Sequence, residues 1–225
     1  MTKAVVLLSG GLDSTVTLAQ AIDDGNEVYA LSFRYGQRHG RELMAAADVC
    51  RHYGVPHTII DINLSSFRSA LTNPDIDVPE NRPEISEKEI PITYVPARNT
   101  IFLSVAAGLC ESIGADLIYI GANIIDYSGY PDCRPDFFSA FEEMLRRGTK
   151  AGVEGNPIRI MTPILKKSKA DIVRLGKKLN APLALTWSCY EGKEKACGKC
   201  DSCILRLRGF REAGYKDEIE YEIPI

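Results

Sequence analysis

The stretch that decides the fold is Lys3-Ala4-Val5-Val6-Leu7-Leu8-Ser9-Gly10-Gly11-Leu12-Asp13-Ser14-Thr15. Its first half is a short apolar run that predicts a buried strand, and a helical period begins after the two glycines. In a parallel sheet, the turn from strand to helix presents backbone N–H groups to an anion. Adjacent glycines let the main chain approach a phosphate, and the serine and threonine hydroxyls add donors. We therefore expect Leu8 to Thr15 to bind a nucleotide phosphate.

Two common phosphate loops do not fit this stretch. The Walker pattern fails because no Gly-Lys-Ser/Thr follows, and the dinucleotide pattern fails because its third glycine is missing. A carboxylate at Asp13 would repel a phosphate unless Mg²⁺ lay between them, so we predict that Asp13 contacts the metal. The alternative is an ordinary tight turn in which Ser14 or Asp13 only caps the helix.

The rest of the chain alternates short apolar runs with helix-period segments, which predicts an α/β fold with a Rossmann-like parallel sheet covered by helices on both faces. We expect strands at 4–8, 27–33, 57–62, 116–121 and 158–164, and helices at about 13–25, 40–54, 99–113, 136–147 and 168–179. The third helix is rich in small and apolar residues, so we expect it to be buried against the sheet. Residues 1–185 would form the nucleotide-binding domain, and 186–225 a helical, metal-binding C-terminal segment.

Two further segments have patterns of their own. Residues 63–93 contain four prolines and many acidic residues with no sustained period, which indicates an insertion that is either a functional lid or disordered. The tail at 216–223 alternates charged and apolar residues and predicts an edge strand.

Composition excludes several classes of protein. The 225 residues carry 27 Lys and Arg against 30 Asp and Glu, a net charge of −3, which disfavours binding to long nucleic acids. No apolar run approaches the roughly 20 residues that span a bilayer, and the N-terminus shows no signal pattern, so we expect a cytoplasmic protein without membrane contact.

Four of the seven cysteines crowd into a fifteen-residue stretch, which argues for a metal rather than for disulfides in a reducing compartment. Two overlapping Cys-x-x-Cys spacings with a fourth thiolate nearby can surround one tetrahedral Zn²⁺ and leave no position open, so we predict a structural zinc knuckle. Redox cysteines, an iron-sulfur cluster and buried thiols are the alternatives. The predicted ligands are Cys189, Cys197, Cys200 and Cys203.

Three polar segments follow predicted strands or precede a helix, where ligands of α/β proteins bind. They are Arg34 to His39, Tyr94 to Thr100 and Tyr127 to Arg134. Arg98, at a helix start, could contact an anion or only cap the helix. Lys169 could reach a phosphate or be a surface lysine without a ligand. The segment from Tyr127 to Arg134 is a tyrosine-rich loop, which could bind a flat polar ring or pack on itself.

The hexapeptide Ser-Gly-Gly-Leu-Asp-Ser resembles the PP-loop of the ATP pyrophosphatases, the enzymes that cleave ATP between its α and β phosphates. Together with Tyr35 to His39, Tyr94 to Asn99, Ser128 to Arg134 and the Ser188-Cys189-Tyr190 cysteine region, it resembles the 7-cyano-7-deazaguanine synthase family. The resemblance spans nearly the whole chain; only residues 63–93 match no family pattern.

That resemblance implies an adenine-nucleotide-hydrolase-like fold and a ligase of queuosine biosynthesis, which adenylates 7-carboxy-7-deazaguanine with Mg-ATP, adds ammonia and dehydrates the amide to a nitrile. It also suggests a homodimer. The residues expected at the reaction are Asp13, Ser14, Arg98 and Lys169, and those expected at the ring and its carboxylate are Arg38, His39, Asp132, Cys133 and Arg134. A PP-loop enzyme that thiolates tRNA and a non-enzymatic zinc-knuckle interaction protein are the rival interpretations.

Overall fold

A five-stranded parallel sheet forms the centre of the protein, with the strand order β3-β2-β1-β4-β5. The computed structural model describes residues 1–81, 90–125 and 129–225. The strands are β1 (Lys3–Leu7), β2 (Glu27–Arg34), β3 (His57–Asp61), β4 (Leu117–Ile120) and β5 (Arg159–Met161). The central strand β1 pairs in parallel with β2 on one side and β4 on the other. The predicted sheet is therefore confirmed.

The central strand β1 is buried on both faces, as its run of apolar residues requires, whereas the edge strand β3 is partly exposed. Successive side chains of a strand point to opposite faces. Val5 and Leu7 accordingly belong to one apolar core, and Ala4 and Val6 belong to another. Ala4, Val5 and Val6 are each 0% exposed, so no face of this strand meets water.

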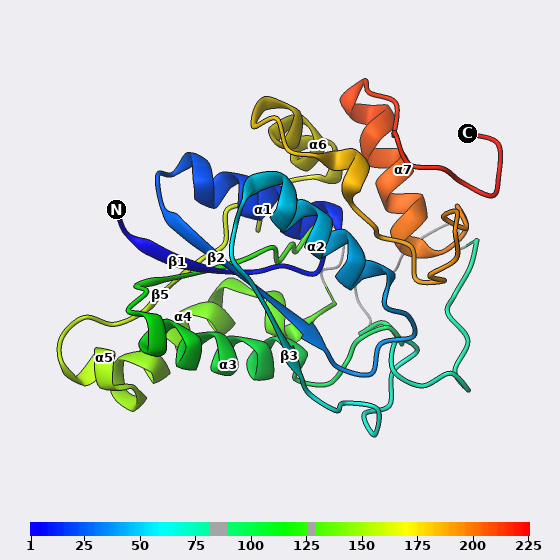
Figure 1. Cartoon of the computed structure of the whole chain (residues 1–225). Coiled ribbons are helices and arrows are strands. Elements are labelled where there is room, and N and C mark those ends of the chain that lie inside the picture. The colour runs from blue at the N-terminus through cyan, green and yellow to red at the C-terminus, as the bar shows by residue number, and fades with distance from the viewer. Residues whose placement is uncertain (82–89, 126–128) are drawn as a thin grey trace.

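Helices cover both faces, as Figure 1 shows. On one face lie α1 (Leu12–Asp23) and α2 (Arg41–Tyr53), and on the other lie α3 (Arg98–Ile113) and α4 (Pro135–Gly148), followed by the short α5 (Lys150–Val153). Beyond α1, α6 (Lys169–Lys178) packs against α7 (Asp201–Ala213). Two 3₁₀ turns, η1 (Pro131–Cys133) and η2 (Leu183–Leu185), complete the order.

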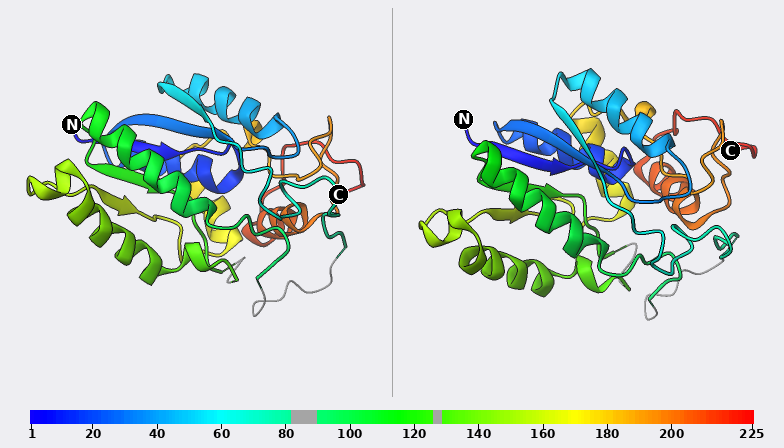
Figure 2. Two further views of the ribbon diagram at one scale, coloured as in Figure 1. Left: turned by 90° about the horizontal axis from the view of Figure 1, so that it is seen from below. Right: turned by 60° about the horizontal axis from the view of Figure 1, so that its bottom comes forward.

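The carboxyl ends of the strands point toward the side of the molecule that holds α7 and the C-terminus, opposite to the N-terminus (Figure 2). The chain order reverses around β1, because β2 lies on one side of it and β4 on the other. In open α/β sheets, ligands bind at the carboxyl end of the sheet where the order reverses. The fold thus places the phosphate loop, which follows β1, at this position.

The helix predictions were correct to within one or two residues, and Gly54 ends α2 in the left-handed conformation. The face of α3 that carries Leu103, Ala106, Ala107 and Cys110 is buried against β1 and β4, as expected. Two details were wrong. β5 is only three residues long, and Pro163 behind it has no N–H for a sheet hydrogen bond.

The C-terminal tail is the second difference. It makes one isolated bridge, between Ala196 and Tyr221, and joins no edge of the sheet. The buried Arg206 holds the Asp217 carboxylate with bonds of 2.6 and 2.9 Å, and the Tyr221 hydroxyl donates to the same carboxylate at 2.8 Å. These contacts fold the tail back onto α7.

No helix in the described ranges is long and apolar enough to cross a bilayer.

Candidate active site

The phosphate loop is organised by its own serines. The Ser14 hydroxyl lies 3.0 Å from the Ser9 hydroxyl and accepts the Ser9 N–H at 3.2 Å, while the Gly11 N–H donates to Ser9 Oγ at 3.3 Å. Helix α1 starts with Gly11 at its N-cap and has no side-chain cap. Backbone N–H groups of its first turn are therefore left without a side-chain cap and could bind an anion.

Gly10 is required by a close approach of two backbones. Its φ is +89°, and a Cβ at this position would lie 2.2 Å from the Glu42 carbonyl oxygen and 2.6 Å from the Ala46 nitrogen. The Gly10 carbonyl in turn accepts the Trp187 N–H at 2.8 Å. The loop is thus clamped between the start of α2 and the segment that leads to the cysteines.

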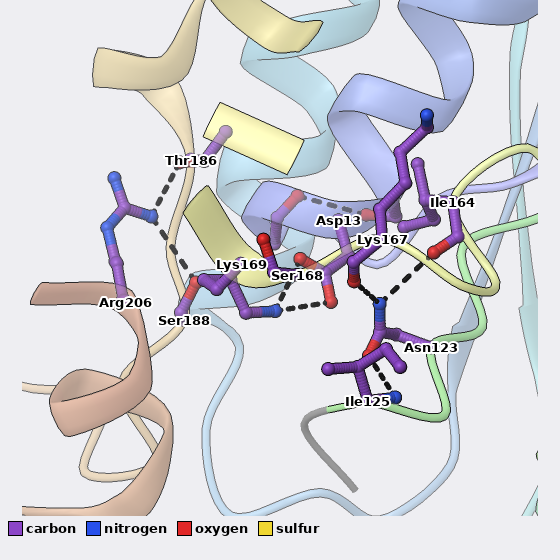
Figure 3. Close-up of polar contacts among 12 residues, drawn as sticks. Asp13, Asn123, Ile125, Ile164, Lys167, Ser168, Lys169, Thr186, Ser188 and Arg206 are labelled. Atoms are coloured by element: carbon purple, nitrogen blue, oxygen red, sulfur yellow. Dashed lines mark hydrogen bonds and ion pairs between the residues drawn. The ribbon is translucent and has the colours of Figure 1, made fainter. Parts of the chain in front are cut away.

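Asp13 and Lys169 form an ion pair at the mouth of this loop, as Figure 3 shows. The Lys169 ammonium donates to both carboxylate oxygens, at 2.7 and 2.8 Å. The lysine side chain is only 10% exposed, so its charge is held inside the protein. Asp13, predicted to contact Mg²⁺, therefore already has a cation beside it.

One cavity of about 290 Å³ opens at the loop. Six of the predicted phosphate contacts line it, and the exceptions are Gly10 and the fully buried Thr15, whose hydroxyl has no partner. Its walls also come from β2, the starts of α2 and α3, the end of β4, α6 and the segment before the cysteines. The lining includes Leu8, Ser9, Gly11, Leu12, Asp13, Ser14, Phe33, Tyr35, Glu42, Leu71, Arg98, Asn99, Phe102, Ala122, Tyr130, Lys169 and Ser188.

Aromatic residues and one arginine form the wall across from the phosphate loop. The Phe33 and Phe102 rings stack at 4.0 Å between centroids, and the Tyr35 ring meets Phe102 edge-on at 5.4 Å. The Arg98 guanidinium lies 6.0 Å from the centre of the Tyr35 ring and donates to its hydroxyl at 3.4 Å. A flat ring that carries an anionic group suits such a wall.

Of the residues predicted at the substrate ring, Arg38, His39 and Cys133 line the cavity, whereas Asp132 and Arg134 do not. Arg38 donates to the Ala70 carbonyl at 2.7 Å and to the carbonyls of Asn73 and Ile76, so it holds the 63–81 part of the insertion in place. Arg134 is exposed at the N-cap of α4. Tyr127 and Ser128 of the tyrosine-rich loop lie outside the described residues.

Asp132 is buried and acts on α3 rather than on the cavity. Its carboxylate accepts the Asn99 N–H at 3.0 Å, and its carbonyl accepts the Asn99 side-chain amide, also at 3.0 Å. α3 has no cap of its own, because Ala97 at its N-cap position has no side-chain acceptor. Asp132 therefore caps the helix that presents Arg98. Burial raises the pKa of this carboxyl.

Sequence reasoning missed three residues that shape the site. The buried guanidinium of Arg206 donates to Thr186 Oγ1 at 2.7 Å and to Ser188 Oγ at 3.3 Å, which orients the Ser188 hydroxyl beside the phosphate loop (Figure 3). Asn123 donates to the carbonyls of Ile164 and Lys167 and so ties the end of β4 to the segment before Lys169. The third residue is Glu42, which lines the cavity from α2. The only sequence feature that could have pointed to Glu42 was its position, three residues after the Arg34 to His39 segment.

The four predicted metal ligands lie together. The sulfur atoms of Cys189, Cys197, Cys200 and Cys203 are all within 4.8 Å of one another, and all four residues are buried. Sulfurs around a tetrahedral Zn²⁺ at 2.3 Å would be about 3.8 Å apart, and Cys197 and Cys203 are at 4.0 Å. Backbone N–H groups of Glu191 and Cys197 donate to the Cys189 sulfur at 3.4 and 3.3 Å. These cysteines can therefore hold a metal ion.

Crowding of the four sulfurs also favours a cation. Hydrogen bonds from the Cys200 and Cys203 thiols lower the pKa of Cys189, so this sulfur is the first to carry a negative charge. The other three cysteines are buried and lie apart from this cluster. Burial raises the pKa of Cys50 to about 11, and that of Cys110 and Cys133 to about 12.

Comparison with known proteins gives one consistent result. Residues 3–214 match a family model described as queuosine biosynthesis protein QueC. A curated protein of Thermoplasma acidophilum is 57% identical over 221 residues, covering 98% of this chain and 92% of its own length. A protein of Acetivibrio thermocellus is 54% identical over 222 residues, covering 98% of both chains. Both relatives are named 7-cyano-7-deazaguanine synthase.

Solved structures agree on the fold. A predicted subunit of tRNA methyltransferase from Methanocaldococcus jannaschii superimposes with a TM-score of 0.51 over 100% of this chain and 93% of that chain. Its sequence is only 16% identical, so the likeness concerns the fold alone.

Proposed function

Since the chain belongs to the queuosine biosynthesis protein QueC family, whose members above are 7-cyano-7-deazaguanine synthases, we propose that its cavity converts 7-carboxy-7-deazaguanine, ammonia and ATP into 7-cyano-7-deazaguanine. The observation that carries this proposal is the continuity of the cavity. One space joins the phosphate loop to the wall of Arg98, Tyr35 and Phe102, so a nucleotide and a flat anionic ring can meet in it.

The chemistry follows from the problem of the leaving group. A carboxylate oxygen cannot leave as oxide, so it attacks the α-phosphorus of ATP, and pyrophosphate departs. Ammonia then attacks the activated carbonyl carbon and displaces AMP, which gives the amide. A second activation, of the amide oxygen, allows that oxygen to leave as the nitrile forms.

We assign nucleotide binding to one wall of the cavity and substrate binding to the other. On the phosphate side, the N–H groups at the start of α1 and the Ser9 and Ser14 hydroxyls hold the triphosphate, and Lys169 stabilises the charge that develops on the departing pyrophosphate. On the other wall, Arg98 orients the substrate carboxylate for in-line attack, while the rings of Tyr35 and Phe102 line the position of the deazapurine. Arg38 and Cys133 border the same space, and His39 supports it from the side of the cysteines.

Two metals are part of the proposal. Zn²⁺ held by the four cysteines would be structural, because four thiolates leave no coordination site for water. Its position supports a role in shaping the active site, since Trp187 and Ser188, directly before Cys189, contact the phosphate loop. Mg²⁺ would enter with ATP and neutralise phosphate charge, with Asp13 as the nearest carboxylate of the loop.

We further propose that residues 1–185 and 186–225 are the two units of the chain, and that the protein acts in the cytoplasm as a homodimer on small molecules. Nucleic acids and membranes are not among its expected partners. The net charge of −3 supports the first of these exclusions.

The experiment is mass spectrometry of the reaction with Mg-ATP, an ammonium salt and 7-carboxy-7-deazaguanine. Asp13→Ala is compared with the control Asp23→Ala, which changes an exposed aspartate near the end of the same helix. We expect the nitrile from the parent protein and the control but not from Asp13→Ala.

Other outcomes would select the rival functions. ATP binding without nitrile would favour another PP-loop substrate, such as a tRNA base. Absence of thermal stabilisation by Mg-ATP in the zinc-loaded protein would favour a non-enzymatic interaction protein.

A further inference from the structure

Glu42 lies beside the phosphate loop, at the contact that requires Gly10. It is the second residue of α2, and its carbonyl oxygen lies against the loop. Glu42 lines the cavity together with Asp13 and Arg98, and the Arg98 guanidinium acts electrostatically on its carboxylate. The Glu42 carboxylate is therefore near both the phosphate loop and the arginine proposed to orient the substrate carboxylate.

No hydrogen bond or ion pair joins the Glu42 carboxylate to any other residue in the part of the chain that the structure describes. In Asp13, the other carboxylate that lines the cavity, both oxygens already accept hydrogen bonds from the Lys169 ammonium. Among the cavity carboxylates in the described ranges, only Glu42 can accept a proton without breaking an existing interaction.

The one histidine that lines the cavity cannot take this role. His39 Nε2 lies 3.1 Å from the Cys189 carbonyl, which can only accept, so the proton is on Nε2 and the lone pair on Nδ1. Nδ1 is buried and has no partner. Gly192 packs directly over the ring, because a Cβ there would lie 2.1 Å from His39 Cγ. A reacting nitrogen has no access to that lone pair.

The surroundings of Glu42 adjust its basicity to this task. Burial raises the pKa of the carboxyl to about 7, while the Arg98 guanidinium acts in the opposite direction. A base with a pKa near the working pH is present in its ionised form and still binds a proton strongly.

We propose that Glu42 is a catalytic residue that accepts the proton released by ammonia when it attacks the adenylated carboxylate. The proposal rests on the proposed function. As the C–N bond forms and the C–O bond to AMP breaks, the nitrogen becomes cationic and must lose one proton to leave a neutral amide. The Glu42 carboxylate takes this proton, becomes a carboxylic acid and returns the proton to solvent. In the second activation the same nitrogen loses its two remaining protons to form the nitrile, from the same place in the cavity.

The test compares two nucleophiles in the Glu42→Gln protein. Glutamine keeps the size and polarity of the side chain but cannot accept a proton. Ammonium salts supply ammonia, and hydroxylamine traps the acyl adenylate as a hydroxamate. Both nitrogens lose a proton after they attack, but the nitrogen of hydroxylamine is much the more acidic and can give its proton to water without a protein base. We expect Glu42→Gln to lose about 100-fold in amide and nitrile formation and to keep hydroxamate formation within about 3-fold. Asp48→Asn, on the surface of the same helix, is the control and should change neither rate.

Glu42→Asp keeps the charge but draws the carboxylate back, and it should lose less than Glu42→Gln with ammonium and nothing with hydroxylamine. This variant also serves if Glu42→Gln does not fold. Equal losses with both nucleophiles would mean that Glu42 positions the substrate or the loop, and would overturn the proposal. No loss with either would overturn it as well. If the parent protein forms neither hydroxamate nor nitrile, the proposed function itself is refuted.

Discussion

The ammonium group of Lys169 lies 2.7 Å from one carboxylate oxygen of Asp13 and 2.8 Å from the other, although the two residues are 156 positions apart in the chain. Asp13 belongs to the first turn of α1, and Lys169 is the first residue of α6 (Figure 3). Both helices therefore begin at the same point of the cavity. In the proposed mechanism, Lys169 is the phosphate-binding cation and the Asp13 carboxylate keeps it in place.

Asp13→Asn and Lys169→Gln should each lower the turnover number by about 100-fold, the usual effect of removing one group that stabilises developing charge. Because the two side chains act as a unit, the double variant should be no slower than the slower single variant. Steady-state rates of the parent, the two single variants and the double variant, measured with saturating Mg-ATP, complete this double-mutant cycle. Losses that simply multiply in the double variant would show that the two residues act independently.

Gly10→Ala should destabilise the protein by at least about 4 kcal/mol, since the new methyl group would meet the backbone of α2 at 2.2 and 2.6 Å. Gly25→Ala is the matched control. Gly25 has a similar φ of +79° but nothing within 4 Å of a Cβ, so only the backbone strain of about 1–2 kcal/mol remains. Urea unfolding of both variants gives the difference. Equal destabilisation would contradict the close approach at Gly10.

Arg206→Leu should cost about 3–5 kcal/mol of folding free energy, because it leaves the Asp217 carboxylate buried without its cation. The side chains of the pair are 2% and 1% exposed. Replacing both partners, as in Arg206→Leu with Asp217→Leu, should recover part of that loss. In addition, Arg206→Leu should weaken ATP binding through Ser188, an effect that the double variant retains. Chemical denaturation and nucleotide titration measure the two effects, and full recovery of ATP binding in the double variant would exclude the role of Ser188.

The cysteines should react in two distinct groups. In the native, metal-loaded protein, iodoacetamide at pH 8 should modify none of the seven within the time that labels a model thiol. Burial holds the pKa of Cys50 at about 11 and that of Cys110 and Cys133 at about 12, so these three remain protonated. Removal of the metal with a chelator should expose Cys189, Cys197, Cys200 and Cys203 to alkylation, as read from the intact mass. Modification of Cys133 in the loaded protein would contradict its protonated state.

Much of this protein could be predicted from local sequence. Apolar runs and glycine stop signals located all five strands and the main helices, because these features depend on contacts between near neighbours. The cysteine spacing predicted a cluster that the structure bears out, and the resemblance to the 7-cyano-7-deazaguanine synthase family is confirmed by a match over residues 3–214. The tail was misread as an edge strand because its alternation is local, whereas the Arg206–Asp217 pair that folds it back is not.

By itself, the sequence determined the sheet, the glycine-rich loop after its first strand and the grouping of the four cysteines. Each of these features depends on a short continuous stretch of sequence, so the local pattern of residues was enough to predict it. Only the tertiary structure decided that Asp132 caps α3 and does not line the cavity, and that His39 is covered by Gly192. It also decided that Glu42 lines the cavity with no hydrogen bond or ion pair to its carboxylate from the described residues. Such roles depend on which groups from distant segments meet at the carboxyl edge of the sheet, and on which charges are already paired there.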